Sequence, residues 1–203
     1  MTSPFGAMVV IANPRAGRGK VGAELADVER ILKDGGLDYR IVRTTHPGHA
    51  TQAAREALAG GERYLVAAGG DGTIHEVVNG MLADDRPAAP DAVLGVLASG
   101  SGCDLVKSFG LPGDAVEGAR RLVGDGVRRI DVGKVTCAAG SAQTVRYFPN
   151  VAQAGVGAAT VARACALPGP RRCRRTAGAP RPTGRRPPSC PPPLPRRTRG
   201  RVP

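Results

Sequence analysis

The fold of this chain is decided by residues 64–73, which read Tyr64-Leu65-Val66-Ala67-Ala68-Gly69-Gly70-Asp71-Gly72-Thr73. The first five of these residues form a short apolar run, which is typical of a buried strand. Thr73 and Glu76 have the spacing of a capping box, and apolar residues follow them at helical spacing. A strand, a glycine turn and a helix start bring backbone N–H groups to a helix N-terminus, where phosphate is favoured. The stretch therefore predicts a phosphate-binding loop that is not of the Walker A type.

Strands and helices are expected to alternate on both sides of this stretch. The expected strands cover residues 7–12, 38–42, 64–68 and 92–97 and a further series from 127 to 135, and the expected helices cover residues 21–33, 50–58, 73–82, a short segment from 104, and 114–123. This alternation predicts a three-layer α/β domain with a mainly parallel sheet. Ligands bind such sheets at the carboxyl ends of the strands, where loops 13–17, 44–48, 69–73 and 99–104 should gather.

The positive charge of the chain is concentrated at its end. Residues 166–203 contain eleven arginines and eleven of the 18 prolines, but no Asp, Glu or Lys. Residues 1–165 therefore hold 18 basic and 17 acidic residues, so the net charge of +12 describes the tail. A segment so poor in apolar residues is expected to be disordered. The abrupt change in composition also fits a GC-rich gene read out of frame, and we favour this frameshift hypothesis.

The sequence shows no signal for secretion or for membrane insertion. No basic and apolar leader precedes Met8, and no apolar run approaches the ~18 residues of a membrane span. The five cysteines lack the paired spacing of a metal site, which favours reduced thiols over a disulfide framework. We therefore expect a cytoplasmic protein without an integral membrane segment, which would meet a lipid partner at the membrane surface.

Polar residues of the expected loops are the first candidates for a site. Asp71 would hold Mg²⁺ through water or orient the loop by accepting N–H bonds, with a simple Asx turn as the alternative. For Glu76 we prefer the capping box, and Asp104 has the alternative of capping the helix that follows it. The loop from Asn13 offers an amide and backbone donors beside a phosphate, with Arg or Lys as counter-charge. The alternative is a plain turn in which Arg15, Arg18 and Lys20 are solvated charges. The three histidines form no cluster.

Taken in order, these motifs resemble the diacylglycerol kinase catalytic domain of bacterial lipid kinases, which are related to sphingosine kinases and distantly to NAD kinases. The motifs that carry the resemblance are Asn13-Pro14-Arg15-Ala16-Gly17, Thr44 with Gly48-His49-Ala50, Gly69 to Gly80, and Gly100-Ser101-Gly102-Cys103-Asp104. Residues 130–133 and 150–155 also fit the family, so the resemblance covers residues 7 to about 162.

The resemblance implies an enzyme of phospholipid metabolism that transfers the γ-phosphoryl group of ATP to a lipid hydroxyl, diacylglycerol-like or sphingoid. The ATP-binding residues that it implies are Asn13, Pro14, Arg15, Ala16, Gly17, Thr44, Gly70, Asp71, Gly72, Thr73, Ile74, His75, Glu76 and Ser101. Asp71, which we assign to catalysis, would join Asp104 and Asp131 in a water-mediated Mg²⁺ network.

Two departures from the family pattern bear on activity. Ser101 and Cys103 stand where the bacterial pattern usually has Thr and Asn, so position 103 loses an amide. The family's β-sandwich domain, which carries the acidic general base, would here be limited to residues 131–165, ahead of the tail at 166–203. We therefore expect a complete ATP-binding α/β domain at residues 1–130 and an incomplete substrate domain, in a truncated chain that is inactive or poorly folded.

Three other functions stay open on the sequence alone. An NAD kinase-like enzyme would share the Gly-Gly-Asp-Gly loop, and a regulatory module would bind a nucleotide without catalysis. The arginine-rich tail could bind an anionic membrane or nucleic acid, although no specific nucleic acid is expected. The Asn-Pro loop and residues 100–104 fit the lipid kinases better than the NAD kinases. The sequence leaves the identity of the lipid and a homodimer open.

Overall fold

The structure, a computed structural model, describes residues 3–99, 102–139 and 142–152, together with residues 156, 158–160 and 163. The chain divides into two compact units, Met1–Ala154 and Gly155–Pro203, and every helix and strand named below lies in the first. The tail at residues 166–203, which the sequence predicts to be disordered, lies outside the described residues.

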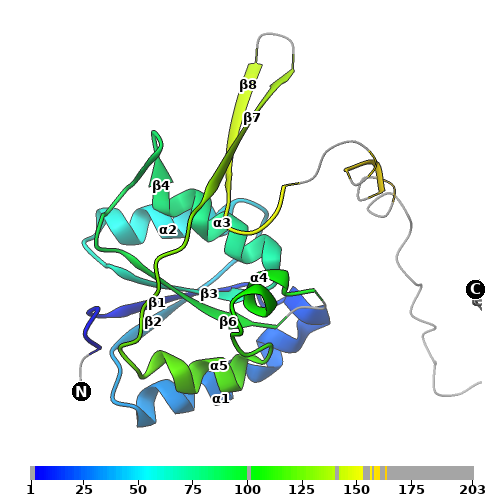
Figure 1. The fold of residues 1–203 in the computed structure, drawn as a ribbon. Coiled ribbons are helices and arrows are strands. Elements are labelled where there is room, and N and C mark those ends of the chain that lie inside the picture. Colours follow the sequence, from blue (N-terminus) through cyan, green and yellow to red (C-terminus); the bar gives the residue numbers. More distant parts are fainter. Residues whose placement is uncertain are drawn as a thin grey trace, which may run out of the picture. The chain divides into compact units, whose positions relative to one another are not determined.

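The first unit is built on a four-stranded parallel sheet in the order β2-β1-β3-β6 (Figure 1). The strands are β1 (Met8–Ala12), β2 (Tyr39–Arg43), β3 (Tyr64–Gly69) and β6 (Val93–Ala98). Every residue of β1 and β3 is buried, which explains why both sequences are continuous apolar runs. The predicted α/β class with a parallel sheet is therefore confirmed.

Helices cover both faces of this sheet. Figure 1 shows α1 (Lys20–Asp34) and α5 (Ala115–Leu122) on one face and α2 (His49–Ala59) and α3 (Asp71–Met81) on the other. The side chains of β1 alternate between the two cores, since Met8 and Val10 pack with α1 and α5 while Val9 and Ile11 pack with α2 and α3. These are the three layers that the alternating sequence pattern predicts.

The shorter elements lie around the sheet. They are the 3-10 helix η1 (Ala16–Gly19), the paired β4 (Leu82–Ala83) and β5 (Arg86–Pro87), the helix α4 (Asp104–Ser108), and the antiparallel hairpin of β7 (Gly133–Ala139) and β8 (Ala142–Phe148). The strand series expected from Val127 begins only at Gly133, because residues 125–132 form no strand. This segment has no neighbouring strand among the described residues, and the Val127 side chain is 62% exposed.

The helix after the glycine turn begins two residues earlier than the capping-box pattern predicts. Gly70 is the N-cap, with extended backbone, and α3 starts at Asp71. Thr73 is already inside the helix and buried, and its side chain packs so closely on Gly69 that a Cβ there would collide with it. The capping box between Thr73 and Glu76 is therefore wrong. The Glu76 carboxylate accepts a hydrogen bond from another helix instead, as described below.

Helices α2 and α3 are in close contact at Gly80. A Cβ on Gly80 would lie 2.6 Å from the Ala54 Cβ and 2.6 Å from the backbone oxygen of Thr51, both in α2. The Thr51 hydroxyl also donates a hydrogen bond to the Glu76 backbone oxygen at 2.8 Å. The missing side chain at position 80 is therefore what lets the two helix backbones approach.

This contact predicts a stability effect for a single added methyl group. We expect Gly80→Ala to lower the free energy of unfolding by about 1–3 kcal/mol, because the methyl group forces α2 and α3 apart. Urea unfolding followed by circular dichroism measures the loss. Gly113→Ala is the control, since a Cβ at Gly113 meets no atom within 4 Å. Equal unfolding midpoints for the two variants would contradict the prediction.

Candidate functional site

A cleft of about 540 Å³ opens at the carboxyl edge of the parallel sheet. The loops that follow β1, β2, β3 and β6 all contribute to it, as the strand order requires. The lining residues are Asn13, Arg15, Ala16, Gly17, Thr44, Thr45, His46, Pro47, Ala50, Gly70, Asp71, Gly72, Thr73, Glu76, Gly102 and Cys103.

Backbone hydrogen bonds between neighbouring strands continue past the strand ends into these loops. The Thr44 N–H donates to the Ala12 oxygen at 2.8 Å, and the Ser99 N–H donates to the Gly69 oxygen at 3.1 Å. Gly17 has a left-handed backbone (φ 59°), and a Cβ there would collide with the Ser99 backbone oxygen. The first and fourth loops therefore touch through backbone atoms, and glycine is required where they meet.

The N-terminus of α3 forms the floor of the cleft. Its N-cap, Gly70, provides no side-chain hydrogen bond, and the first N–H groups of any α-helix lack acceptors within the helix. Gly70 and Gly72 both line the cleft, and a Cβ on Gly72 would meet no atom within 4 Å. Backbone donors, the positive end of the helix dipole and free space therefore coincide, which suits an anion such as a phosphate.

The Asp71 carboxylate contacts the fourth loop. Asp71 Oδ1 accepts a hydrogen bond from the Leu105 N–H, in the first turn of α4, at 3.3 Å. Asp71 Oδ2 is close to Gly102, where a Cβ would lie 3.2 Å from it. Because α4 has no hydrogen bond from its own N-cap side chain, Asp71 provides the acceptor for its first turn.

The Glu76 carboxylate plays the corresponding part for α2. Glu76 Oε2 accepts a hydrogen bond from the Ala50 N–H, at the second position of α2, at 3.1 Å. The N-cap of α2, Gly48, has no side chain that could do this. Glu76 therefore caps a neighbouring helix rather than its own, and it holds the loop before α2 next to α3.

The loop after β2 forms the rim of the cleft. The Thr45 N–H donates to His49 Nδ1 at 3.1 Å, so His49 supplies an acceptor inside the loop. The rings of His46 and His49 are stacked, with centroids 5.0 Å apart and planes 12° from parallel. Thr44, Thr45 and His46 line the cleft, so this compact loop provides it with both hydroxyl groups and a ring.

Arg15 supplies positive charge to the cleft. Its N–H donates to Asn13 Oδ1 at 3.1 Å, which fixes the turn after β1, and within the described residues Arg15 forms no ion pair. The nearby Lys20 is engaged elsewhere, since its Nζ lies 3.1 Å from carboxylate oxygens of both Glu24 and Asp114. Hydrogen bonds to Asp114 and Glu24 raise the pKa of Lys20. Arg15 is thus the guanidinium available to a bound anion.

Several predicted site residues lie outside the lining of the cleft. Pro14 is absent from it, Ile74 is buried in the core, and His75 lies at the side of α3 that contacts β8. Burial is the main cause that lowers the pKa of His75, with Arg146 acting in the same direction. Ser101 lies outside the described residues.

The three aspartates of the expected metal network have different environments. Asp71 lines the cleft, whereas the Asp104 carboxylate is exposed and pairs with Lys107 at 3.3 Å. Asp131 is exposed in the irregular segment before β7. Among the described residues, no group of three or more His, Cys, Asp or Glu side chains could hold a metal ion directly.

The sequence prediction also missed part of the lining. The lining residues that the sequence did not single out are Thr45, His46, Pro47, Ala50, Gly102 and Cys103, and all but Ala50 lie in the loops 44–48 and 99–104 that it places at this edge. All of them follow the end of a parallel strand, and this position alone was the signal for them. The contact of Glu76 with α2 joins residues 26 positions apart, so no local pattern shows it.

Comparison with known proteins gives one consistent result. The family model of the diacylglycerol kinase catalytic domain matches residues 7–135. A diacylglycerol kinase of Bacillus subtilis (strain 168) is 37% identical over 148 residues, and one of Staphylococcus haemolyticus (strain JCSC1435) is 32% identical over 146 residues; each alignment covers 72% of this chain. A solved structure of a diacylglycerol kinase from Bacillus anthracis str. Sterne superposes with a TM-score of 0.52 at 26% identity.

The matches extend over only part of the relatives. The chain spans 45% and 41% of the two kinases named above, and the superposition covers 66% of this chain and 43% of the solved structure. In the part of the chain that the structure describes, no helix is both long and apolar enough to cross a membrane.

The contact between Glu76 and α2 predicts a difference between two substitutions. We expect Glu76→Ala to lower the free energy of unfolding by about 1 kcal/mol, because the Ala50 N–H loses its acceptor. Glu76→Gln keeps an oxygen in place and should cost clearly less. Urea unfolding measures both, with Glu56→Ala on the exposed surface of α2 as the control. A Glu76→Ala variant as stable as this control would show that the cap is unimportant.

Proposed function

Because the chain belongs to the diacylglycerol kinase catalytic domain family, we propose that its cleft binds ATP for transfer of the γ-phosphoryl group to a lipid hydroxyl. The observation that carries the proposal is the uncapped N-terminus of α3 at the floor of the cleft. Phosphoryl transfer depends on positioning and on neutralising the charge of the phosphates, and this surface offers both.

Different cleft residues would contact different parts of the nucleotide. The N–H groups at the start of α3, with Gly70 and Gly72, would bind the phosphates, and Arg15 would neutralise part of their charge. The loop after β2, with Thr44 and Thr45, would contact the nucleoside through its hydroxyl groups. Asn13 shapes the first loop by accepting the Arg15 N–H.

The cleft residues fit an Mg²⁺ ion that is bound jointly by the protein and by the phosphates of the nucleotide. Asp71 is a cleft-lining carboxylate, and Mg²⁺ usually keeps several waters and combines one or two carboxylates with substrate phosphates. When bound, Mg²⁺ would neutralise phosphate charge. We propose Asp71 as its protein partner through water, and as the residue that orients the fourth loop through the Leu105 N–H. Asp104 and Asp131 would take part only through further waters.

The lipid acceptor is proposed from the printed names of the relatives. The proteins that match are diacylglycerol kinases, and the chain spans less than half of each of the two named above. A diacylglycerol would reach the cleft from a membrane surface. Such an acceptor has a primary hydroxyl as the nucleophile, and its proton must pass to a base in the course of the reaction.

Transfer of radiolabel tests this function directly. The full chain is incubated with γ-labelled ATP, Mg²⁺ and either diacylglycerol in mixed micelles, sphingosine or NAD. Label in phosphatidic acid supports the proposal, and label in sphingosine phosphate would change the acceptor. Label in NADP would replace the proposal with an NAD kinase activity. If calorimetry shows ATP binding but no acceptor carries label, the chain would be a nucleotide-binding module without catalysis.

The phosphate role of the glycine turn makes a separate prediction. Gly72→Val should weaken ATP binding by at least about tenfold, because the new side chain occupies open space beside the α3 N–H groups. Its unfolding midpoint should change little, since a Cβ at this position meets no neighbour. Calorimetric titration with ATP measures the affinity, and Gly113→Val is the control. Unchanged affinity in a folded Gly72→Val protein would place the phosphates elsewhere.

A further inference from the structure

The side chain of Asn79, in the last turn of α3, holds the backbone of β8. Asn79 Nδ2 donates to the Tyr147 backbone oxygen at 2.8 Å, and Asn79 Oδ1 accepts from the Tyr147 N–H at 3.0 Å. The same Nδ2 donates to the His75 backbone oxygen at 2.8 Å, one turn earlier in the helix. Two carbonyl oxygens on one side and an N–H on the other determine which way the amide is oriented.

Tyr147 is a position at which β8 needs a partner. In the hairpin it stands opposite Lys134, and its own N–H and carbonyl oxygen point outward to Asn79. Outward backbone groups of this kind are unpaired at the edge of a sheet. The Asn79 amide offers one donor and one acceptor, as a residue of a neighbouring strand would, and among side chains only Asn and Gln carry an N–H donor together with a carbonyl acceptor.

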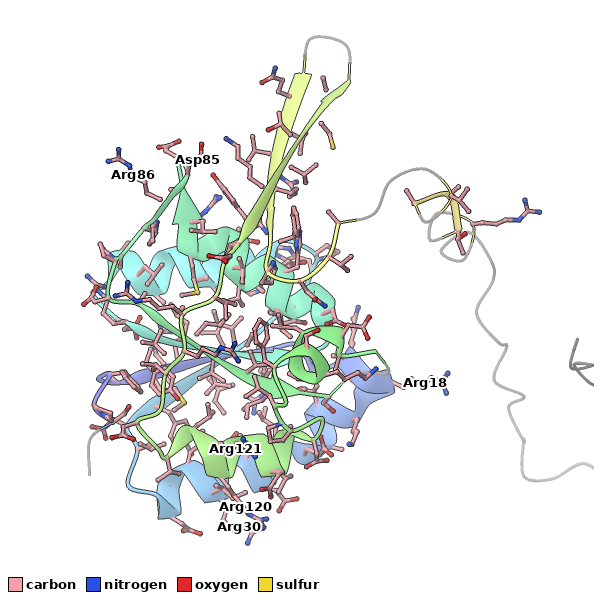
Figure 2. All side chains as sticks on the ribbon, in the orientation of Figure 1. Arg18, Arg30, Asp85, Arg86, Arg120 and Arg121 are labelled. Atoms are coloured by element: carbon pink, nitrogen blue, oxygen red, sulfur yellow. The ribbon has the colours of Figure 1, made fainter. Side chains whose placement is uncertain are left out.

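A second contact fixes β8 through the side chain of Tyr147. The Tyr147 hydroxyl donates to Asp85 Oδ1 at 2.9 Å and accepts from the Asp85 N–H at 3.0 Å. Lys134 Nζ lies 2.7 Å from Asp85 Oδ2, so both strands of the hairpin are tied to this residue. Figure 2 shows Asp85 at the turn between β4 and β5, directly after α3. The hairpin is therefore attached at two points, Asn79 and Asp85, to one continuous segment of the chain, residues 71–85.

Helix α3 thus carries two functional ends. Its N-terminus lacks a side-chain cap and faces the cleft, while Asn79 in its last turn holds the hairpin. Eleven residues of helix separate the two ends by only ~16 Å. An anion at the first turn would act as a cap and stabilise α3. A ligand that binds only the formed helix would also stabilise the hairpin contacts that depend on that helix.

We propose that Asn79 is the positioning residue that fixes the β7–β8 hairpin on the phosphate-binding helix, and that ATP binding and docking of the hairpin are therefore linked. The linkage rests on the proposed function, because it needs a nucleotide at the N-terminus of α3. It is reciprocal, so a docked hairpin favours the nucleotide site as much as the nucleotide favours docking.

A single exchange of atoms in Asn79 tests the contact. Asn79→Asp keeps the acceptor for the Tyr147 N–H but turns an oxygen toward the Tyr147 and His75 carbonyl oxygens. Hydrogen exchange in residues 142–148 of the full chain, followed by mass spectrometry, should speed up by roughly tenfold. Gln143→Glu is the matched control, since it makes the same change at an exposed position of β8. Asn79→Ala, which adds no charge, should show the same direction, and circular dichroism verifies that each variant is folded.

The linkage is tested by repeating the exchange with ATP at a hundred times its Kd. In the unsubstituted chain, exchange of residues 142–148 should slow by at least about tenfold, within the hundredfold limit set by binding to the folded state. In Asn79→Asp, ATP at a hundred times the Kd of this variant should give little protection to the hairpin, and by reciprocity calorimetry should show ATP binding up to about tenfold weaker than in the unsubstituted chain. A residue with only a structural role would not uncouple binding from protection.

The outcomes separate the two proposals. Equal exchange in Asn79→Asp and Gln143→Glu overturns the positioning role, whatever the nucleotide does. ATP binding without protection of the hairpin in the unsubstituted chain overturns the linkage but leaves the proposed nucleotide site intact. If ATP produces no heat at all, the proposed function and the linkage fall together, while the exchange without nucleotide still decides the role of Asn79.

Discussion

The constraint on which this structure depends is the supply of acceptors to the helix N-termini that meet at one edge of the sheet. Helices α2, α3 and α4 all begin there, and none has a side-chain hydrogen bond from its own N-cap. Two carboxylates of α3 resolve this for its neighbours, since Glu76 accepts from α2 and Asp71 accepts from α4. Of these three helices, α3 is the one whose N-terminus receives no side-chain acceptor among the described residues, so α3 caps two neighbouring helices and leaves its own N-terminus open to an anion.

Close backbone contacts keep these N-termini in fixed positions. Gly17 lets the first loop touch the Ser99 carbonyl, and Gly80 lets α3 touch α2. The Ser99 hydroxyl donates to Glu24 Oε2 at 3.0 Å, and Glu24 also pairs with Lys20. The fourth loop is thereby joined to α1 as well as to the sheet. Contacts of this kind hold the described parts of the loops in place, which lowers the ordering cost of binding.

Most of the fold was predictable because its signals are local. The buried strands are continuous apolar runs, and the helices show one apolar face, so their order along the chain determined three layers and the ligand-binding edge. The capping box failed because Thr73 lies inside the helix and packs on Gly69, while the Glu76 carboxylate accepts from Ala50, 26 positions away in α2. The strand series expected from Val127 begins only at Gly133, because a strand exists only where a neighbour pairs with it. Contacts such as Asn79 with Tyr147, 68 positions apart, leave no periodic trace.

Position 103, where Cys stands in place of the Asn usual in the family pattern, shows how a distant contact affects the interpretation of a local sequence difference. Cys103 is the N-cap of α4 and has a left-handed backbone (φ 49°), a conformation that Asn adopts far more readily than most residues. The Asn usual in the family resemblance could also accept an N–H from the first turn of α4. In this chain Asp71 provides that acceptor through the Leu105 N–H, and Cys103 is 97% buried in the packing around it. Asp71 thus supplies the side-chain acceptor at the start of α4, which ties the geometry of the fourth loop to α3.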